Sequence, residues 1–209
     1  MQWFAKRGVS SRMAIEFRLP PPPEDLALRR LPVRRVRVLF RIHRSIQGCL
    51  YFSKTGDGRF DDPRGKYGVL YAALKPDAAF AEVFLRQLSL LLIQESDLMQ
   101  RLLSEISCRS VKCVDLTGPG LRQLSCDNRL ATEKPYQTTG LWSRAIFEHP
   151  QQPGGIIYRS RHNPQFKCVA LFDRHARDLS VKSTESLLSG SLRAWTVDQI
   201  NRYKLAIQP

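Results

Sequence analysis

The order of strand-like and helix-like segments is the feature that most limits how this chain can fold. Short apolar or alternating runs, which are typical of β-strands, occupy residues 36–42, 67–73, 111–116, 156–160 and 167–172. Helical patterns occupy residues 78–93, 95–106 and 136–148, and the last stretch, 180–209, predicts a helix and a strand. The order therefore predicts mixed α and β structure without the regular βαβ units of a parallel sheet.

The size and composition of the chain favour one folded domain with a substantial core. The chain has 209 residues, of which 43% are hydrophobic and 25% are charged. A chain of this length buries about 70% of the surface that it exposes when unfolded. The composition excludes a disordered or collagen-like chain. No window approaches 18 consecutive apolar residues and the first residues do not form a secretory signal, so no membrane segment is expected.

A strong positive charge is concentrated near the N-terminus. The net charge is +14, and residues 1–44 hold 11 of the 33 basic residues against 3 of the 19 acidic ones. Such a chain favours polyanions, namely nucleic acid, phosphorylated small molecules or an acidic protein, although a solvated basic arm explains the front segment equally well. The proline run at residues 20–23 stops any helix. We therefore expect a basic, proline-containing extension at residues 1–36 and a folded domain at residues 37–209.

The five cysteines do not form a disulfide or metal pattern. Cys49, Cys108, Cys113, Cys126 and Cys168 include no CxxC pair, and no histidine lies close enough to complete a zinc site. An odd number of cysteines without such spacing is typical of buried free thiols in a reducing compartment. We therefore expect a cytoplasmic protein without a bound metal.

The residues that could carry chemistry are dispersed rather than gathered in one nucleotide-binding motif. The sequence has no GxGxxG, GxxxxGK[ST], HExxH or GxSxG motif. Glu82 stands out because Ala78 and Ala79, one turn earlier on the predicted helix, leave room beside its carboxylate. The alternative is a surface ion pair between Glu82 and Arg86, which would stabilise the helix by only about 0.3 kcal/mol.

Two arginines and a tyrosine are further candidates. Arg59 follows Gly58 in a glycine-rich loop, where the backbone can approach a ligand closely and a guanidinium can bind phosphate oxygens. The alternative for Arg59 is an ion pair with a neighbouring aspartate such as Asp61. Arg41 directly follows an apolar strand and could bind an anion or pair with a buried carboxylate. Tyr71 ends a strand and could line a site or belong to the core.

Taken in order, these segments resemble the RES domain family. The similar motifs are Phe40-Arg41-Ile42-His43-Arg44, Gly58-Arg59-Phe60-Asp61, Gly68-Val69-Leu70-Tyr71-Ala72-Ala73, Ala79-Phe80-Ala81-Glu82, the run from Gly155 to Pro164, and Val169-Ala170-Leu171-Phe172. The resemblance spans residues 40–174. It departs from the family at the loop, where Asp57 precedes Gly58 in place of a second glycine and Asp61 stands where the family often has asparagine.

The resemblance implies one α+β domain with an ADP-ribosyltransferase-like fold, in which helices flank a central mixed or antiparallel sheet. It makes residues 37–209 a RES-like catalytic domain that acts on NAD as a substrate, with no resident cofactor and no metal. Characterised members of the family are toxins of toxin–antitoxin pairs. The resemblance therefore implies NAD, inorganic phosphate and an acidic antitoxin protein as partners.

The resemblance also implies a role for each candidate side chain. Glu82 matches the family glutamate, which would stabilise the positive charge that forms when the bond to nicotinamide breaks. Arg41 and Arg59 match the two arginines and would bind pyrophosphate or phosphate, with Gly58 allowing close approach. Tyr71 matches the strand tyrosine, which would stack on, or shape the pocket for, nicotinamide or ribose.

The family serine matches either Ser160 or Ser143, and both stay candidates for a hydrogen bond to phosphate or nicotinamide. With this set of residues the resemblance implies that phosphate cleaves NAD to nicotinamide and ADP-ribose-1″-phosphate. Transfer of ADP-ribose to a protein acceptor would use the same site and is the first alternative. Nucleic-acid binding through the basic arm is the second alternative, and only the charge supports it.

Overall fold

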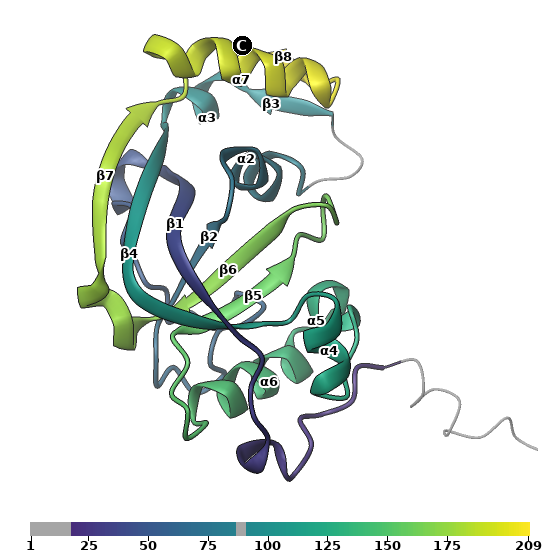
Figure 1. The fold of residues 1–209 in the computed structure, drawn as a ribbon. Coiled ribbons are helices and arrows are strands. Elements are labelled where there is room, and N and C mark those ends of the chain that lie inside the picture. The colour runs from purple at the N-terminus through teal and green to yellow at the C-terminus, as the bar shows by residue number, and fades with distance from the viewer. Residues whose placement is uncertain (1–17, 87–90) are drawn as a thin grey trace, which may run out of the picture.

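Six strands form the central sheet of this protein, in the order β1-β2-β6-β5-β4-β7 (Figure 1). The computed structural model describes residues 18–86 and 91–209. The six strands are β1 (Val33–Arg44), β2 (Val69–Ala73), β4 (Arg101–Asp115), β5 (Gly155–Arg159), β6 (Lys167–Phe172) and β7 (Leu179–Ser186). β1 also pairs with β4, so five strands close into a circuit and β7 extends it from β4. Among the pairs of these six strands only β4–β5 is parallel, which makes the sheet mixed.

The two faces of the sheet bury separate sets of apolar side chains. Along β6, Cys168, Ala170 and Phe172 belong to one core cluster, whereas Val169 and Leu171 belong to the other. This alternation follows from the two-residue period of a strand. Because both faces are covered, β5 and β6 are buried at nearly every position, as their continuous apolar sequence predicts.

Helices lie at both ends of the sheet. In Figure 1, α2 lies on the concave side of β1 and β4 beneath α7, and α4, α5 and α6 lie near β5 at the opposite end. The helices are α2 (Pro76–Phe84), α3 (Glu95–Met99), α4 (Pro119–Gln123), α5 (Arg129–Thr132), α6 (Gln137–Phe147) and α7 (Gly190–Arg202). Short 3-10 segments are η1 (Leu26–Leu28), η2 (Ser45–Gln47) and η3 (Asp173–Asp178), the last of which is kinked at His175. A separate parallel pair consists of β3 (Leu92–Gln94) and β8 (Ala206–Gln208). This architecture confirms the predicted α+β class.

Two predicted helices are shorter in the structure than the sequence pattern indicated. α2 ends at Phe84 instead of residue 93, and β3 occupies the end of the predicted range, while residues 87–90 lie outside the described residues. Of the predicted helix at 95–106, only α3 is helical, because residues from Arg101 onward belong to β4. β4 pairs with β1 on one side and β7 on the other. This pairing with two neighbouring strands outweighs the helical spacing of Leu102, Leu103 and Ile106 in the local sequence.

Residues 18–32 pack against the domain instead of extending away from it. Leu19, Leu26 and Leu31 are at most 3% exposed and belong to the larger core cluster. The indole nitrogen of Trp142 donates a hydrogen bond to the carbonyl of Pro20 at 2.8 Å. The described chain therefore packs on the core from Leu19 onward, whereas the extension was expected to run to residue 36, because burial of these apolar side chains removes them from water. The first 17 residues of the expected extension lie outside the described residues.

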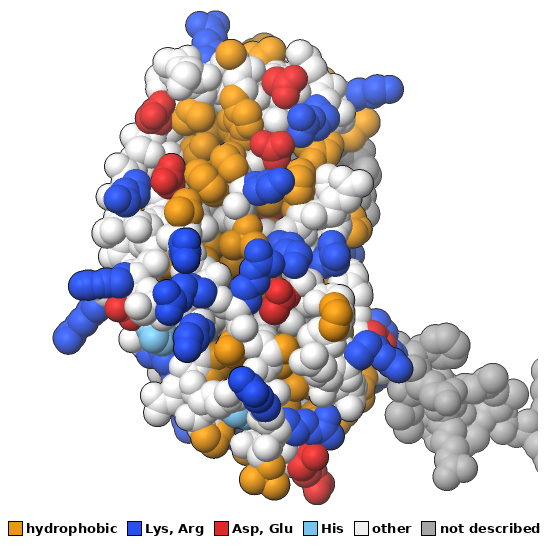
Figure 2. Space-filling view, in the orientation of Figure 1, with side chains coloured by type: hydrophobic (Ala, Val, Ile, Leu, Met, Phe, Trp, Pro, Cys, Tyr) orange, Lys and Arg blue, Asp and Glu red, His pale blue; other side chains and the backbone are white. Residues whose placement is uncertain are grey.

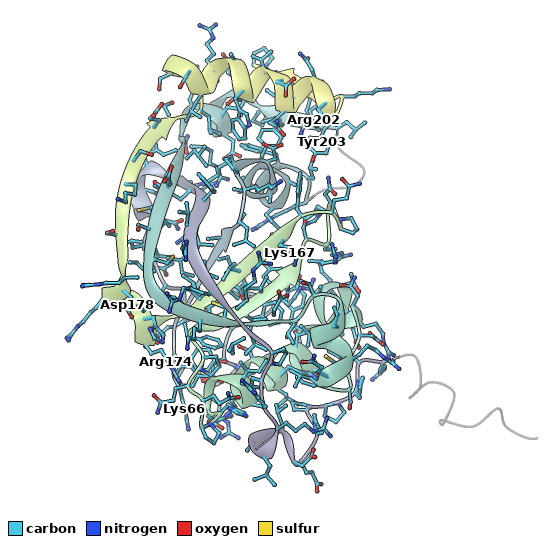
Figure 3. All side chains as sticks on the ribbon, viewed as in Figure 1. Lys66, Lys167, Arg174, Asp178, Arg202 and Tyr203 are labelled. Atoms are coloured by element: carbon cyan, nitrogen blue, oxygen red, sulfur yellow. The ribbon has the colours of Figure 1, made fainter. Side chains whose placement is uncertain are left out.

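Side chains of α7 and of the residue that follows it bind α2 and the β5–β6 connection. Arg202 forms a 2.8 Å ion pair with Asp77 at the start of α2, and the Trp195 indole donates to the same carboxylate at 3.1 Å. Asn163, between β5 and β6, donates to the hydroxyl of Tyr203 at 3.2 Å. Figure 3 shows Arg202 and Tyr203 at the end of α7.

The five cysteines are buried and free, as expected. No described helix is long and apolar enough to cross a membrane.

Candidate active site

Two adjoining cavities of about 460 and 300 Å³ share the side chains of Tyr71, Glu82, Arg86 and Tyr158. The larger one, the loop cavity, is also lined by Gly58, Arg59, Tyr136, Arg161 and His162. The smaller one, the strand cavity, is also lined by Arg41, His43, Arg44, Gln47 and Arg101. The shared walls make the two cavities one groove with Glu82 at the junction. The structure thus brings together five of the predicted residues: Arg41, Gly58, Arg59, Tyr71 and Glu82.

Glu82 presents a carboxylate that is only partly satisfied. It lies on α2, next to the buried Ala78 and Ala79. Its Oε1 atom is buried and has no hydrogen-bond partner among the described residues. The alternative ion pair with Arg86 does not form, since the Arg86 Nε donates at 2.7 Å to the backbone carbonyl of Glu82. A buried acceptor without a partner is unusual in native proteins and is well suited to accept a hydrogen bond from a ligand.

Arg59 carries a buried positive charge that no described carboxylate neutralises by an ion pair. Its side chain is 8% exposed. Nη1 donates at 2.8 Å to the carbonyl of Glu133, and the guanidinium lies 4.6 Å from the ring centre of Tyr136. Burial lowers the pKa of Arg59, although an arginine stays protonated near neutral pH. A buried guanidinium that is held in place and lacks a carboxylate favours binding of an anion.

The loop that carries Arg59 is fixed by a network around Asp61. The Tyr71 hydroxyl donates to Asp61 Oδ1 and accepts from the Phe60 N–H, both at 2.8 Å, while the Gly58 N–H donates to Asp61 Oδ2 at 3.0 Å. A Cβ atom at Gly58 would collide with the Tyr71 hydroxyl. Both oxygens of Asp61 are thus engaged by this network, and the predicted alternative of an Arg59–Asp61 ion pair does not form. Burial keeps the pKa of Tyr71 well above its ordinary value, so its hydroxyl stays a donor.

Arg41 enters the groove from β1 on the other side of Glu82. Its Nη1 donates at 2.9 Å to the carbonyls of both Cys49 and Tyr51. No carboxylate among the described residues forms an ion pair with Arg41, so its predicted alternative does not form either. Burial lowers its pKa, but the group stays charged near neutral pH. The two bonds on one nitrogen leave the rest of the guanidinium available to an anion in the strand cavity.

Comparison with known proteins shows to which family this chain belongs. The RES domain family matches residues 34–194. This chain belongs to the RES domain family. The match includes every element that lines the groove, from β1 to the β5–β6 connection. It confirms the resemblance seen in the sequence motifs.

Two known proteins are similar to this RES domain, one in sequence and one in structure. A protein named "Probable toxin y4kH" from Sinorhizobium fredii is 37% identical over 92 residues, which cover 41% of this chain and 72% of that protein. One chain of the solved M. tuberculosis MbcT-MbcA toxin-antitoxin complex superposes with a TM-score of 0.66 at 15% identity, over 86% of this chain and 98% of that chain. At this identity the likeness shows the fold alone. It agrees with the ADP-ribosyltransferase-like fold that the motifs implied.

Neither serine that the motifs offered to the RES site lines the groove. Ser143 is fully buried in the middle of α6, where its hydroxyl donates to the carbonyl of Phe60 at 2.6 Å and contacts the Tyr67 hydroxyl at 2.8 Å. Ser143 thus holds in place the loop that carries Arg59. Ser160 accepts hydrogen bonds from the backbone N–H groups of His162 and Asn163, both at 3.1 Å. In this structure both serines are buried, and neither is among the described residues that line the two cavities.

Several residues that line the groove of this RES domain were not predicted from the sequence, among them two tyrosines and a histidine. Tyr136 stacks on Arg59, Tyr158 lines both cavities, and His162 lies in the loop cavity. Burial lowers the pKa of His162, and the nearby arginines lower it further, while Glu82 acts in the opposite direction. Tyr158 and His162 belong to a motif run that the sequence analysis quoted, but Tyr136 gave no local signal.

The electrostatic character of the groove is basic. Arginines line both cavities that meet at Glu82, and Asp57 is the one further acidic residue among the described residues that line them. Figure 2 shows Lys and Arg side chains gathered across the middle of the face drawn, with fewer Asp and Glu among them. Fixed positive charge around a carboxylate and three tyrosines suits a ligand that combines phosphate groups with aromatic rings.

Proposed function

We propose that this RES domain protein cleaves NAD with inorganic phosphate, releasing nicotinamide and ADP-ribose-1″-phosphate. The observation that carries the proposal is the unpartnered Glu82 oxygen, among the described residues, at the junction of two basic cavities. NAD combines a pyrophosphate, two riboses and two aromatic rings, and the groove offers arginines, a carboxylate acceptor and tyrosine rings in that neighbourhood. NAD is the substrate in this proposal, and no resident cofactor or metal is required.

Glu82 contributes to the bond-breaking step. The bond between the ribose carbon and the nicotinamide nitrogen breaks, and its electron pair leaves with the nicotinamide, which becomes neutral. Positive charge then develops on the ribose, as in other glycosyl transfers. A fixed carboxylate at this point stabilises that charge and accepts a hydrogen bond from a ribose hydroxyl. An oxygen of phosphate forms the new bond to the same carbon.

Arg59 and the tyrosines orient the dinucleotide. Arg59 is immobilised by Glu133 and Tyr136, so little side-chain freedom is lost when it binds a pyrophosphate oxygen. Tyr158 and Tyr136 line the loop cavity together with Glu82, where nicotinamide or ribose would pack against them. Tyr71 acts mainly through the Asp61 network, which holds Arg59 in place. Arg41 supplies positive charge on the far side of Glu82.

The biological role proposed here is that of a toxin in a toxin–antitoxin pair. Two observations support this role: the Sinorhizobium relative is named a probable toxin, and the structurally similar M. tuberculosis chain comes from a toxin-antitoxin complex. A toxin that depletes NAD would harm its own cell unless it were inhibited, and an acidic antitoxin would suit the basic groove. The buried free thiols support a cytoplasmic location.

Incubation of the purified full chain with NAD, with and without phosphate, tests the proposal. Mass spectrometry of the products should find nicotinamide and ADP-ribose-1″-phosphate, and their amount should depend on phosphate. Modification of an added protein by ADP-ribose, without dependence on phosphate, would instead support the transferase alternative. Unchanged NAD under both conditions would overturn the proposal.

A further inference from the structure

A third cavity continues the groove beyond the strand cavity. Its volume is about 490 Å³, and it shares Arg44, Val83, Arg86 and Arg101 with the strand cavity. Its far wall comes from α3, with Asp97 among its lining residues. We call it the arginine cavity. Arg86 lines all three cavities, so the groove runs from the Arg59 loop past Glu82 to α3.

The arginine cavity has two positive charges in excess. Three guanidinium groups line it and Asp97 is its one acidic lining residue among those described. Arg101 binds Asp97 through Nε and Nη2 at 3.2 and 3.0 Å, and Arg44 approaches the same carboxylate at 3.7 Å. Arg86 uses Nε toward the Glu82 carbonyl. Several guanidinium N–H groups therefore stay available, and the excess charge matches that of HPO₄²⁻.

The two ends of the groove suit different chemical groups. Tyr71, Tyr136 and Tyr158 line the loop cavity, where aromatic rings and ribose can pack. The arginine cavity has Phe84 as its one aromatic lining residue among those described, and its other walls combine Ser96 and Gln100 with three aliphatic side chains. Guanidinium, amide and hydroxyl groups with few ring faces favour a small hydrated oxyanion over a nucleotide base.

We propose that the arginine cavity is the subsite for the acceptor phosphate, with Arg44, Arg86 and Arg101 as its ligands. This inference rests on the proposed function and assigns the two anionic groups of the reaction to opposite sides of Glu82. The pyrophosphate of NAD binds at Arg59, and HPO₄²⁻ enters past Arg86. Its oxygen attacks the ribose carbon as the nicotinamide leaves with the bonding electron pair, and the phosphate proton stays on the product or is lost to solvent. No further reactant is needed.

A matched pair of substitutions on β1 tests the subsite by kinetics. Arg44→Gln removes a proposed ligand, whose side chain is 50% exposed and lies 3.7 Å from Asp97. The control is Arg34→Gln on the same strand. The Arg34 side chain is 56% exposed and lies 3.8 Å from Asp115, but it lies outside the groove. We expect Arg44→Gln to raise the KM for phosphate about tenfold, as for one lost charge-assisted contact, and to leave the KM for NAD unchanged. We expect no change in Arg34→Gln. An unchanged KM for phosphate, or an equal rise of both KM values in Arg44→Gln, overturns the inference.

Direct titration with inorganic phosphate separates this inference from the proposed function. Calorimetry of the full chain without NAD should detect phosphate binding, which Arg44→Gln weakens and Arg34→Gln does not. Inability of the wild-type chain to consume NAD overturns the proposed function, yet the titration still decides whether the cavity binds an oxyanion. Equal affinity of the wild-type chain and Arg44→Gln for phosphate, or no binding by either, overturns the subsite.

Discussion

At the scale of single residues, Glu82 and Arg59 are the clearest cases of charge placed for a ligand instead of for the fold. Neither side chain forms an ion pair among the described residues; Arg59 is held by Glu133 and Tyr136, and the buried Oε1 of Glu82 has no hydrogen-bond partner among those residues. A surface ion pair would have contributed little to stability. Substitutions of these two residues should therefore change the activity much more than the stability.

Substitution Glu82→Gln should reduce the turnover of NAD by about 100-fold or more, because a fixed charge of this kind stabilises a transition state by about 3 kcal/mol. The free energy of unfolding should change little, since the Glu82 carboxylate forms no ion pair with the described part of the chain. Steady-state kinetics and urea unfolding measure the two quantities. Glu185→Gln, at an exposed position on β7, is the control and should match the wild-type chain. Wild-type turnover in Glu82→Gln would remove Glu82 from the reaction.

Substitution Arg59→Lys should raise the KM for NAD roughly 10- to 100-fold, because lysine keeps the charge but cannot form two parallel hydrogen bonds or stack on Tyr136. The effect on kcat should be smaller if the contact is equally strong in the ground state and the transition state. Kinetics at varied NAD and constant phosphate measure this. Arg64→Lys, in the same loop but exposed, should leave both constants unchanged. An unchanged KM for NAD in Arg59→Lys would exclude a contact between Arg59 and the dinucleotide.

At the scale of elements, the segment before β1 belongs to the core although its sequence resembles a flexible arm. A chain that starts at residue 31 loses the burial of Leu19 and Leu26 and the acceptor of the Trp142 indole. We expect its free energy of unfolding to fall by about 3 kcal/mol or more, from about 1.5–3 kcal/mol for each buried leucine. A chain that starts at residue 18 is the control and should unfold like the full chain. Equal unfolding free energies for the two truncated chains would show that the segment does not stabilise the domain.

At the scale of the whole molecule, several buried titratable groups limit stability at both ends of the pH range. Burial lowers the pKa of His43 and His162, so the unfolded chain binds more protons than the folded chain as the pH falls below about 6.5. Burial raises the pKa of Cys108 from 9.0 to about 11 and that of Cys126 to about 12. Above pH 9.0 the unfolded thiols ionise while the folded ones keep their protons, which favours unfolding.

The free energy of unfolding should therefore be greatest between these limits, and urea unfolding at pH 5, 7.5 and 10.5 measures it. Stability should be lower at the first and last pH than at the middle one. Cys108→Ala should reduce the loss between pH 7.5 and 10.5, because it removes one of the groups that ionise on unfolding. Equal stability at pH 7.5 and 10.5 in the wild-type chain would contradict the assignment of the buried thiols.

Local sequence alone determined the strands β1, β2, β5 and β6, the helix α6 and five of the candidate residues that line the groove, because periodicity and short motifs act over a few residues. Only the tertiary structure decided that Arg101 and the residues after it form a strand, since pairing with both neighbours outweighs a helical pattern. It also decided the environment of Arg59, whose partner Glu133 is 74 positions away, and the role of Ser143, which binds the Phe60 carbonyl 83 positions away. Such contacts depend on which segments the closed circuit of strands brings together, and no local pattern encodes that.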